Sequence, residues 1–400
     1  MLDGCAGAVP PRLHRVGPRG KSMTESMAHP TTGRPEQRTA RTAPDGAPGP
    51  DRHTGDAHTA DGHEAAALLE RTRAAVDPVL RTALGSLPAP MRRVALYHFG
   101  WQNEDGTPAG GGSGKALRPA LVLAAASALG GSAARTAALR AAAAVELVHN
   151  FTLVHDDVMD RDTTRRHRPT VWTVFGDADA ILVGDALQAL ALRLLAEDPH
   201  PAAPAAAARL AQCVVELCAG QHVDTALERR APDEVTLEET LAMAEAKTGA
   251  LLGCACALGA LYADAGDAEV AAMDAFGRAA GLAFQLIDDV IGTWGDPRRT
   301  GKPAGADLAA RKKSLPVVAA LTSGTPEAGE LAAAYAAPHR EGDVGRLTRL
   351  VERAGGRDWA QTQAADRMAR AMQEVARAVP DPEAAGGLLA LAEFVTRRTT

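Results

Sequence analysis

Apolar residues recur at intervals of three and four positions along most of the chain from His63 onward, which is the period of an amphipathic helix. Five long segments follow this pattern, at 132–160, 171–196, 203–229, 235–262 and 267–292. Proline and glycine mark the breaks between them, and shorter helices follow Ser314. We find neither the alternation of a strand nor a repeat of fixed period. We therefore expect an all-α fold, a single large bundle of long helices over residues 63–400.

Residues 1–62 differ from the rest in composition. They contain eight Pro and nine Gly but no Phe, Trp or Tyr, and eight basic residues nearly balance seven acidic ones. Such a segment cannot bury enough apolar surface to offset the entropy of ordering it, so we expect a disordered tail. Three interpretations stay open: a start codon placed too early, with Met23 or Met27 inside the segment, a tail that docks on a partner or scaffold, or a tail without a role.

Composition and charge exclude several other classes of protein. Aromatic residues make up only 3% of the chain, which argues against an all-β sandwich or barrel. The longest stretches without a charge, 119–134 and 248–263, are too short to span a bilayer, and the N-terminus lacks the apolar segment of a signal peptide. The net charge of −6 disfavours nucleic acid as a partner. Five cysteines without complete zinc-site spacing are typical of a reducing compartment, so we expect a cytoplasmic protein.

The strongest chemical signal is the acidic end of the helix predicted over 132–160, which reads HNFTLVHDDVMD from residue 149 to 160. Asp156 and Asp160 are four residues apart, so their carboxylates project from one face, and His149 lies two turns earlier on that face. A hard divalent cation relieves the repulsion between two such carboxylates, and Mg²⁺ binds through one or two carboxylates plus substrate phosphates. A solvated acidic helix end is the alternative, which the apolar flanking residues disfavour.

Basic groups stand close to this acidic motif and at the start of a helix near residue 117. Arg165 and Arg166 follow Asp160 within a TTRRHRP segment, and guanidinium groups so near a metal site suit a phosphate. Lys115 and Arg118, in GKALRP, are three residues apart and could converge on one anion. This segment follows a glycine-rich stretch but does not match a P-loop or a dinucleotide fingerprint.

Two further motifs lie on the later predicted helices. Lys247 and Thr248 precede a glycine inside an apolar helix, which indicates close approach to a ligand, although a lysine that extends to solvent is an equal alternative. Asp288 and Asp289 form a second acidic pair after an apolar run. Two acidic helix ends that face each other could hold a cluster of Mg²⁺ ions, bind a diphosphate and stabilise it as a leaving group. An apolar bundle beneath them would hold a hydrocarbon and exclude water.

Taken together and in this order over 114–316, the motifs resemble those of the trans-isoprenyl diphosphate synthases, the polyprenyl synthetase family. The resemblance implies the isoprenoid synthase fold, with helices around a central apolar cavity, and a homodimer. It implies a Mg²⁺-dependent prenyltransferase that condenses isopentenyl diphosphate (IPP) head to tail with an allylic diphosphate. In that reaction the departing diphosphate takes the proton, and no protein nucleophile is needed.

The resemblance also implies roles for individual residues. Those implied to hold the diphosphate of IPP are Lys115, Arg118, His149 and Arg166. Those implied to bind the allylic diphosphate are Arg165, Lys247, Thr248, Gln285 and Lys302. Those implied to ligate Mg²⁺, with three ions per active site, are Asp156, Asp160 and Asp288. Asp157 and Lys247 complete the implied catalytic set, and Gly220, Gln221 and Asp224 resemble a lining element.

One position departs from the family pattern. The second motif usually reads Asp-Asp-x-x-Asp, but its fifth position here is Gly292, and the next acid in line is Asp296, which could supply the missing carboxylate. The spacing of Asp288, Gly292 and Asp296 is also that of a class I terpene cyclase motif, although a cyclase would leave the IPP-site cations unexplained. A non-catalytic regulatory subunit of a prenyl synthase is a further alternative.

The length of the product is indicated by Phe151 and the adjacent Thr152. Phe151 lies five residues before Asp156, about 7.5 Å along the helix at ~1.5 Å per residue. A ring at this depth would close the floor of a hydrocarbon pocket, and in similar enzymes that arrangement accompanies C20 products. A purely structural role in the core is the alternative for Phe151. We predict geranylgeranyl diphosphate as the product.

Overall fold

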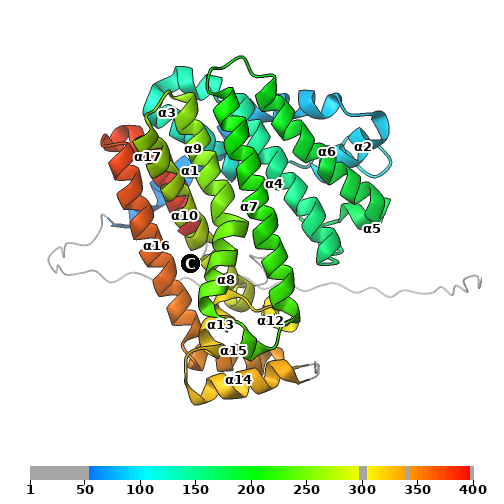
Figure 1. Ribbon diagram of the computed structural model, residues 1–400, viewed down its shortest axis with the longest axis vertical. Coiled ribbons are helices and arrows are strands. Elements are labelled where there is room, and N and C mark those ends of the chain that lie inside the picture. The colour runs from blue at the N-terminus through cyan, green and yellow to red at the C-terminus, as the bar shows by residue number, and fades with distance from the viewer. Residues whose placement is uncertain (1–53, 113, 297–303, 338–341, 397–400) are drawn as a thin grey trace, which may run out of the picture. The chain divides into compact units, whose positions relative to one another are not determined.

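The computed structural model describes residues 54–112, 114–296, 304–337 and 342–396, and nearly all of them are helical (Figure 1). The first half of the chain forms α1 (Thr54–Gly85), α2 (Ala89–His98), α3 (Leu117–Ala137), α4 (Leu139–Met159), α5 (Val171–Phe175), α6 (Asp177–Ala196) and α7 (Ala203–Arg229). The second half forms η1 (Pro232–Glu234), α8 (Leu237–Ala244), η2 (Glu245–Gly249), α9 (Ala250–Tyr262), α10 (Asp267–Trp294), α12 (Ala306–Ala309), α13 (Leu315–Leu321), α14 (Pro326–Ala336), α15 (Val344–Arg353), α16 (Gly356–Ala378) and α17 (Pro382–Thr396). The predicted all-α fold is confirmed.

The predicted segments match the helices with a few instructive differences. The segment 203–229 coincides with α7, and 267–292 corresponds to α10. The segment 132–160 is divided at Ala138, because α3 continues to Ala137 and α4 begins only at Leu139. The segment 171–196 is interrupted at Gly176, whose φ of 92° ends α5. Glycine is the residue that adopts such a backbone conformation without strain.

The N-terminal boundary also differs from the prediction. Helix α1 begins at Thr54, so helical structure starts before the predicted boundary at His63. Residues 1–53 lie outside the described residues, and a disordered or docking tail there stays a prediction.

The core is built from small side chains that let helices pack closely. A Cβ at Gly259 of α9 would lie 2.7 Å from the Cβ of Ala125 of α3. A Cβ at Gly277 of α10 would lie 2.7 Å from the Cα of Gly253 of α9. These helices run side by side through the bundle, and larger residues at the contacts would force them apart.

Three helical stretches are long and apolar enough to cross a membrane by length and composition: 117–137, 237–262 and 267–294. Half to two thirds of each apolar window is buried inside the fold, at 50%, 67% and 67%. Their apolar faces are thus used largely in packing. The expectation that no segment crosses a membrane stays a prediction.

A short antiparallel hairpin follows α4, with β1 (Thr164–Arg165) paired to β2 (Arg168–Pro169). Within the described residues, this hairpin and an isolated bridge between Gln102 and Pro108 are the exceptions to the all-α fold. Two residues alone form the turn, Arg166 and His167, and both have positive φ, at 51° and 62°. Positive φ at both central residues matches the twist of a tight hairpin. The hairpin holds Arg165 and Arg166 beside the acidic end of α4.

Candidate active site

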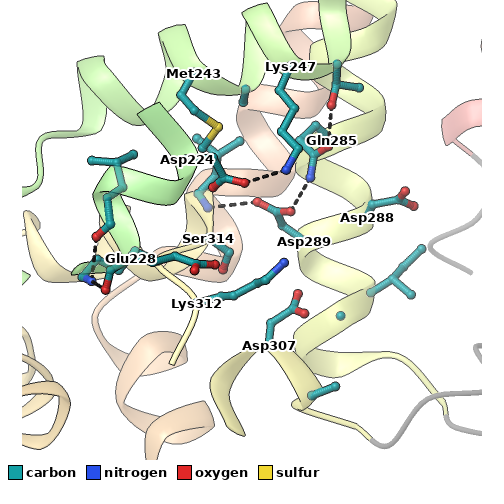
Figure 2. A pocket seen from close by; sticks show the side chains of 18 of the residues that line it. Asp224, Glu228, Met243, Lys247, Gln285, Asp288, Asp289, Asp307, Lys312 and Ser314 are labelled. Atoms are coloured by element: carbon teal, nitrogen blue, oxygen red, sulfur yellow. Dashed lines mark hydrogen bonds and ion pairs between the residues drawn. The ribbon is translucent and has the colours of Figure 1, made fainter. Parts of the chain in front are cut away.

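Two cavities of similar size adjoin each other in the bundle, one of about 570 Å³ and the other of about 550 Å³. The first, shown in Figure 2, lies among α7, η2, α10 and α12 and is rich in charged side chains. The second lies between α4 and α7 and has more apolar walls. Lys247 and Thr248 line both cavities. We name them the charged cavity and the apolar cavity, and η2 is the wall between them.

The π-helical turn η2 places Lys247 and Thr248 in this wall. It packs directly on α7, because a Cβ at Gly220 would lie 2.8 Å from the backbone nitrogen of Lys247. Lys247 Nζ donates to Asp224 Oδ2 at 2.6 Å, and Thr248 Oγ1 donates to Gln285 Oε1 at 2.8 Å (Figure 2). Burial lowers the pKa of Lys247, but the nearby carboxylates outweigh burial and raise it overall. The wall therefore carries a fixed positive charge.

The three acids of the first acidic motif lie in different surroundings. Asp156 lines the apolar cavity, and burial raises the pKa of its carboxyl to about 6, with Lys247 acting in the opposite direction. Asp160 ends α4 and is exposed. Asp157 is only 1% exposed and accepts hydrogen bonds from Arg165, at 2.8 Å from Nε. Asp157 thus anchors the hairpin, and a contact between Arg165 and a diphosphate stays a prediction.

The predicted IPP site is partly assembled at the start of α3. An Arg118 terminal nitrogen lies 3.1 Å from His149 Nε2. The Arg166 guanidinium lies against Gly114, where a Cβ would come within 2.6 Å of it. Burial and the surrounding guanidinium groups hold the pKa of His149 well below its usual range, so its imidazole is neutral and can accept a hydrogen bond from Arg118. Lys115 lines the charged cavity instead.

A buried carboxyl lies beneath these cations, on the same helix as His149. Glu146 is 2% exposed, and Asn150 Nδ2 donates to its Oε1 at 3.2 Å. His98 Nε2 lies 3.1 Å from Asn150 Oδ1, which extends the polar chain to α2. Burial raises the pKa of Glu146 to about 7, although the positive charges of Arg118 and Arg166 act to lower it.

The second acidic pair lies on α10, and both of its acids line the charged cavity. Asp289 is nearly buried and accepts from Gln285 Nε2 at 2.7 Å and from the backbone N–H of Leu315 at 2.9 Å. Burial raises its pKa to about 7. Asp289 therefore ties α10 to the start of α13 and fixes Gln285, which in turn accepts from Thr248.

Several residues of the charged cavity were not assigned a role from the sequence: Glu228, Asp307, Lys312 and Lys313. Burial lowers the pKa of Lys312, but carboxylates that include Asp160, Asp224 and Asp307 raise it overall. The positive charge of Lys312 is thus stabilised by carboxylates at the end of α4, on α7 and on α12. The basic run at 311–313 was visible in the sequence, but nothing there indicated which residue faces the site. Lys302, predicted for the allylic diphosphate, lies outside the described residues.

The chemistry of the donors fits Mg²⁺. Within the described ranges no group of three metal-ligating side chains is already assembled. Mg²⁺ does not require one, because it keeps several waters and binds through one or two carboxylates plus substrate phosphates. The carboxylate that faces the apolar cavity, Asp156, and the one that faces the charged cavity, Asp288, supply oxygen donors of this type.

The apolar cavity extends along α4 away from Asp156. Phe151 and Thr152 line it, with Phe151 only 5% exposed. The Phe151 ring meets the His155 ring edge to face, with 5.4 Å between centroids. Leu217 and Met159 also face the cavity. These apolar side chains lie next to the polar groups of Asp156 and Lys247 in the same cavity.

Comparisons with known proteins agree with this arrangement. The Polyprenyl synthetase family profile matches residues 110–353. The chain is 52% identical to geranylgeranyl diphosphate synthase of Mycobacterium tuberculosis over 83% of this chain and 93% of the relative. It is 44% identical to (2E,6E)-farnesyl diphosphate synthase of the same species, over 81% and 90%. The crystal structure of polyprenyl synthetase from Streptomyces coelicolor A3(2) superposes with a TM-score of 0.78 at 44% identity, covering 82% of this chain and 98% of that one.

Proposed function

The chain belongs to the polyprenyl synthetase family and is a prenyltransferase, and from this premise we propose that it condenses IPP head to tail with an allylic diphosphate to give geranylgeranyl diphosphate. The observation that carries the proposal is the shared wall at Lys247 and Thr248. It joins an apolar cavity, suited to a prenyl chain, to a charged cavity, suited to a diphosphate.

In the proposed reaction, the C–O bond of the allylic diphosphate breaks and its electron pair leaves with the diphosphate. The terminal alkene carbon of IPP forms a new C–C bond to the allylic carbon, and the diphosphate takes the proton that is lost. Mg²⁺, held by Asp156, Asp160 and Asp288, would neutralise charge on the leaving group. Lys247 and Lys312 add fixed positive charge where negative charge develops, and such preorganised charge stabilises a transition state.

The second substrate is proposed to bind at Arg118, His149, Arg166 and Lys115. The neutral His149 imidazole orients the Arg118 guanidinium, and the hairpin brings Arg166 to Gly114. A planar guanidinium is suited to two hydrogen bonds with a phosphate. The presence of this cationic group favours a synthase over a terpene cyclase, which has no IPP to bind. The relatives, named as prenyl diphosphate synthases, favour it over a regulatory subunit.

Product length is proposed from Phe151, which lines the apolar cavity and whose ring we propose as its floor along α4. The two relatives described above are named for products of different length, so the family alone leaves C15 and C20 open. Product analysis with Mg²⁺, IPP and each of the C5, C10 and C15 allylic diphosphates tests the proposal. We expect a single C20 diphosphate and one diphosphate released per IPP consumed. No IPP consumption with any primer would refute the synthase, and a C15 end product would refute the role of Phe151.

We also propose a homodimer in the cytoplasm. Large apolar side chains are exposed on the neighbouring helices α6 and α7, with Ile181 at 46%, Leu182 at 54% and Val215 at 61% exposure. Large apolar side chains exposed on neighbouring helices support a protein interface at this face. The four described cysteines are free thiols, which is consistent with a reducing compartment. Analytical ultracentrifugation of the purified protein tests the dimer, and a monomer at micromolar concentration would contradict it.

A further inference from the structure

The second acidic motif lacks a side chain at its fifth position. Gly292 stands four residues after Asp288 on α10, so the two positions share a face of the helix. Both line the charged cavity. A carboxylate at position 292 would have stood one turn below Asp288 and faced the same space.

The carboxylate of Asp307 occupies the space that a side chain at 292 would need. A Cβ built at Gly292 would lie 3.0 Å from Asp307 Cγ and 3.5 Å from Oδ1, with Oδ2 closer still. Asp307 reaches this point from α12. Figure 2 shows its carboxylate directed toward α10 and close to the end of Lys312. Because a Cβ and this carboxylate exclude each other, glycine at 292 is what lets Asp307 approach the helix.

The other nearby acids are less suited to this role. Both oxygens of Asp289 already accept hydrogen bonds, Oδ1 from Gln285 and Oδ2 from the backbone of Leu315. Asp296 follows the end of α10 at Trp294 and is not among the residues that line the charged cavity. Asp307, by contrast, lines that cavity together with Asp288.

We propose that Asp307 is the second carboxylate directed at Mg²⁺ in the charged cavity, acting with Asp288 in place of a side chain at position 292. Residues four apart on a helix have Cβ atoms about 5–6 Å apart, so a carboxylate held at the Cβ position of residue 292 lies near enough to act with Asp288 on one hydrated ion. The inference rests on the proposed function, which brings a Mg²⁺-bound diphosphate into this cavity.

The test measures metal binding directly, without turnover. Mn²⁺ serves as the probe, and bound ions are counted by electron paramagnetic resonance with inorganic pyrophosphate present. We expect Asp307→Asn to weaken one class of Mn²⁺ site about 10- to 100-fold, the range observed when groups that support a metal site are removed. The matched control is Asp296→Asn, which we expect to leave every site unchanged.

A double variant tests whether a carboxylate from α10 can replace that of Asp307. Gly292→Asp in the Asp307→Ala background returns one carboxylate to the same space from the opposite side, and we expect it to recover most of the lost affinity. Circular dichroism melts establish that each variant is folded. Unchanged Mn²⁺ binding in Asp307→Asn, or a loss in Asp296→Asn with none in Asp307→Asn, would overturn the proposal. A third outcome would also overturn it: Asp307→Asn binds pyrophosphate more weakly in the absence of metal but keeps its Mn²⁺ affinity. Asp307 would then act only as a support for Lys312.

Turnover of the wild-type protein is measured separately with IPP and the C15 allylic diphosphate. A protein that binds Mn²⁺ through Asp307 but consumes no IPP would refute the proposed function and leave this inference standing. A protein that condenses IPP normally but shows no Asp307-dependent Mn²⁺ site would refute the inference and leave the function standing.

Discussion

The buried carboxyl of Glu146 gives a prediction about stability and pH. Glu146 lies beneath the cationic site, 2% exposed, with Asn150 donating to it. Burial raises its pKa from 4.5 to about 7, so the native state holds the carboxyl in its neutral form over a range where the unfolded chain ionises it. Glu146→Gln keeps the shape and the acceptor oxygen but removes the charge.

The sign follows from proton linkage. Between about pH 4.5 and 7 the native state binds more protons at this site than the unfolded state, so the free energy of unfolding falls as pH rises. Below that window the carboxyl is protonated in both states. Above it the native state bears the full free-energy cost of an ionised carboxylate in a buried position. This rise in the pKa corresponds to about 3 kcal/mol in the free energy of unfolding, since one pKa unit is worth about 1.4 kcal/mol. Glu146→Gln should remove the penalty, and so stabilise the protein at pH 8 but not at pH 4.5.

Urea unfolding followed by circular dichroism at half-unit pH steps measures this difference. The matched control is Glu197→Gln, because the Glu197 side chain is 64% exposed and its loss should leave the pH slope unchanged. We expect the wild-type and Glu146→Gln curves to diverge between pH 4.5 and 7 and then run parallel. Parallel curves over the whole range, or a Glu146→Gln protein that is less stable at pH 8, would refute the assignment of a buried neutral carboxyl.

Three further predictions concern the cavities and the core. Phe151→Ala should move the main product beyond C20, measured by mass spectrometry, and an unchanged product would show that the ring is not the floor. Lys312→Gln should weaken pyrophosphate binding about tenfold or more, since hydrogen bonds to charged groups are worth about 1.5–3 kcal/mol; calorimetry measures this, and unchanged affinity contradicts it. Gly259→Ala should destabilise the fold by about 1–3 kcal/mol because its Cβ would collide with α3; an unchanged urea midpoint contradicts that packing.

Much of the fold was predictable because helical periodicity dominates this sequence. The segment 203–229 coincides with α7, and both acidic motifs lie on the helices expected for them. The errors fall at two breaks. Ala138 and Gly176 interrupt segments that apolar spacing alone joins, because spacing carries no information about backbone conformation.

The site was predictable in its residue types but less so in their partners. Asp156 and Asp288 face the cavities as expected. Asp157 is instead bound by Arg165, and Asp289 lines the charged cavity but accepts a hydrogen bond from the backbone of Leu315. Adjacent acids on a helix point in different directions, but the sequence does not say which direction meets a structural partner. The approach of Asp307 to Gly292 is a contact between separate segments, which no local pattern could reveal.

The most direct test of the account is a crystal structure with Mg²⁺, IPP and a non-reactive thio analogue of the C15 allylic diphosphate. We expect the prenyl chain in the apolar cavity with its end at Phe151, and its diphosphate between Asp156 and Asp288 beside Lys247. We expect the IPP diphosphate at Arg118 and Arg166. A prenyl chain outside the cavity lined by Phe151, or an allylic diphosphate bound away from both acidic motifs, would contradict the account.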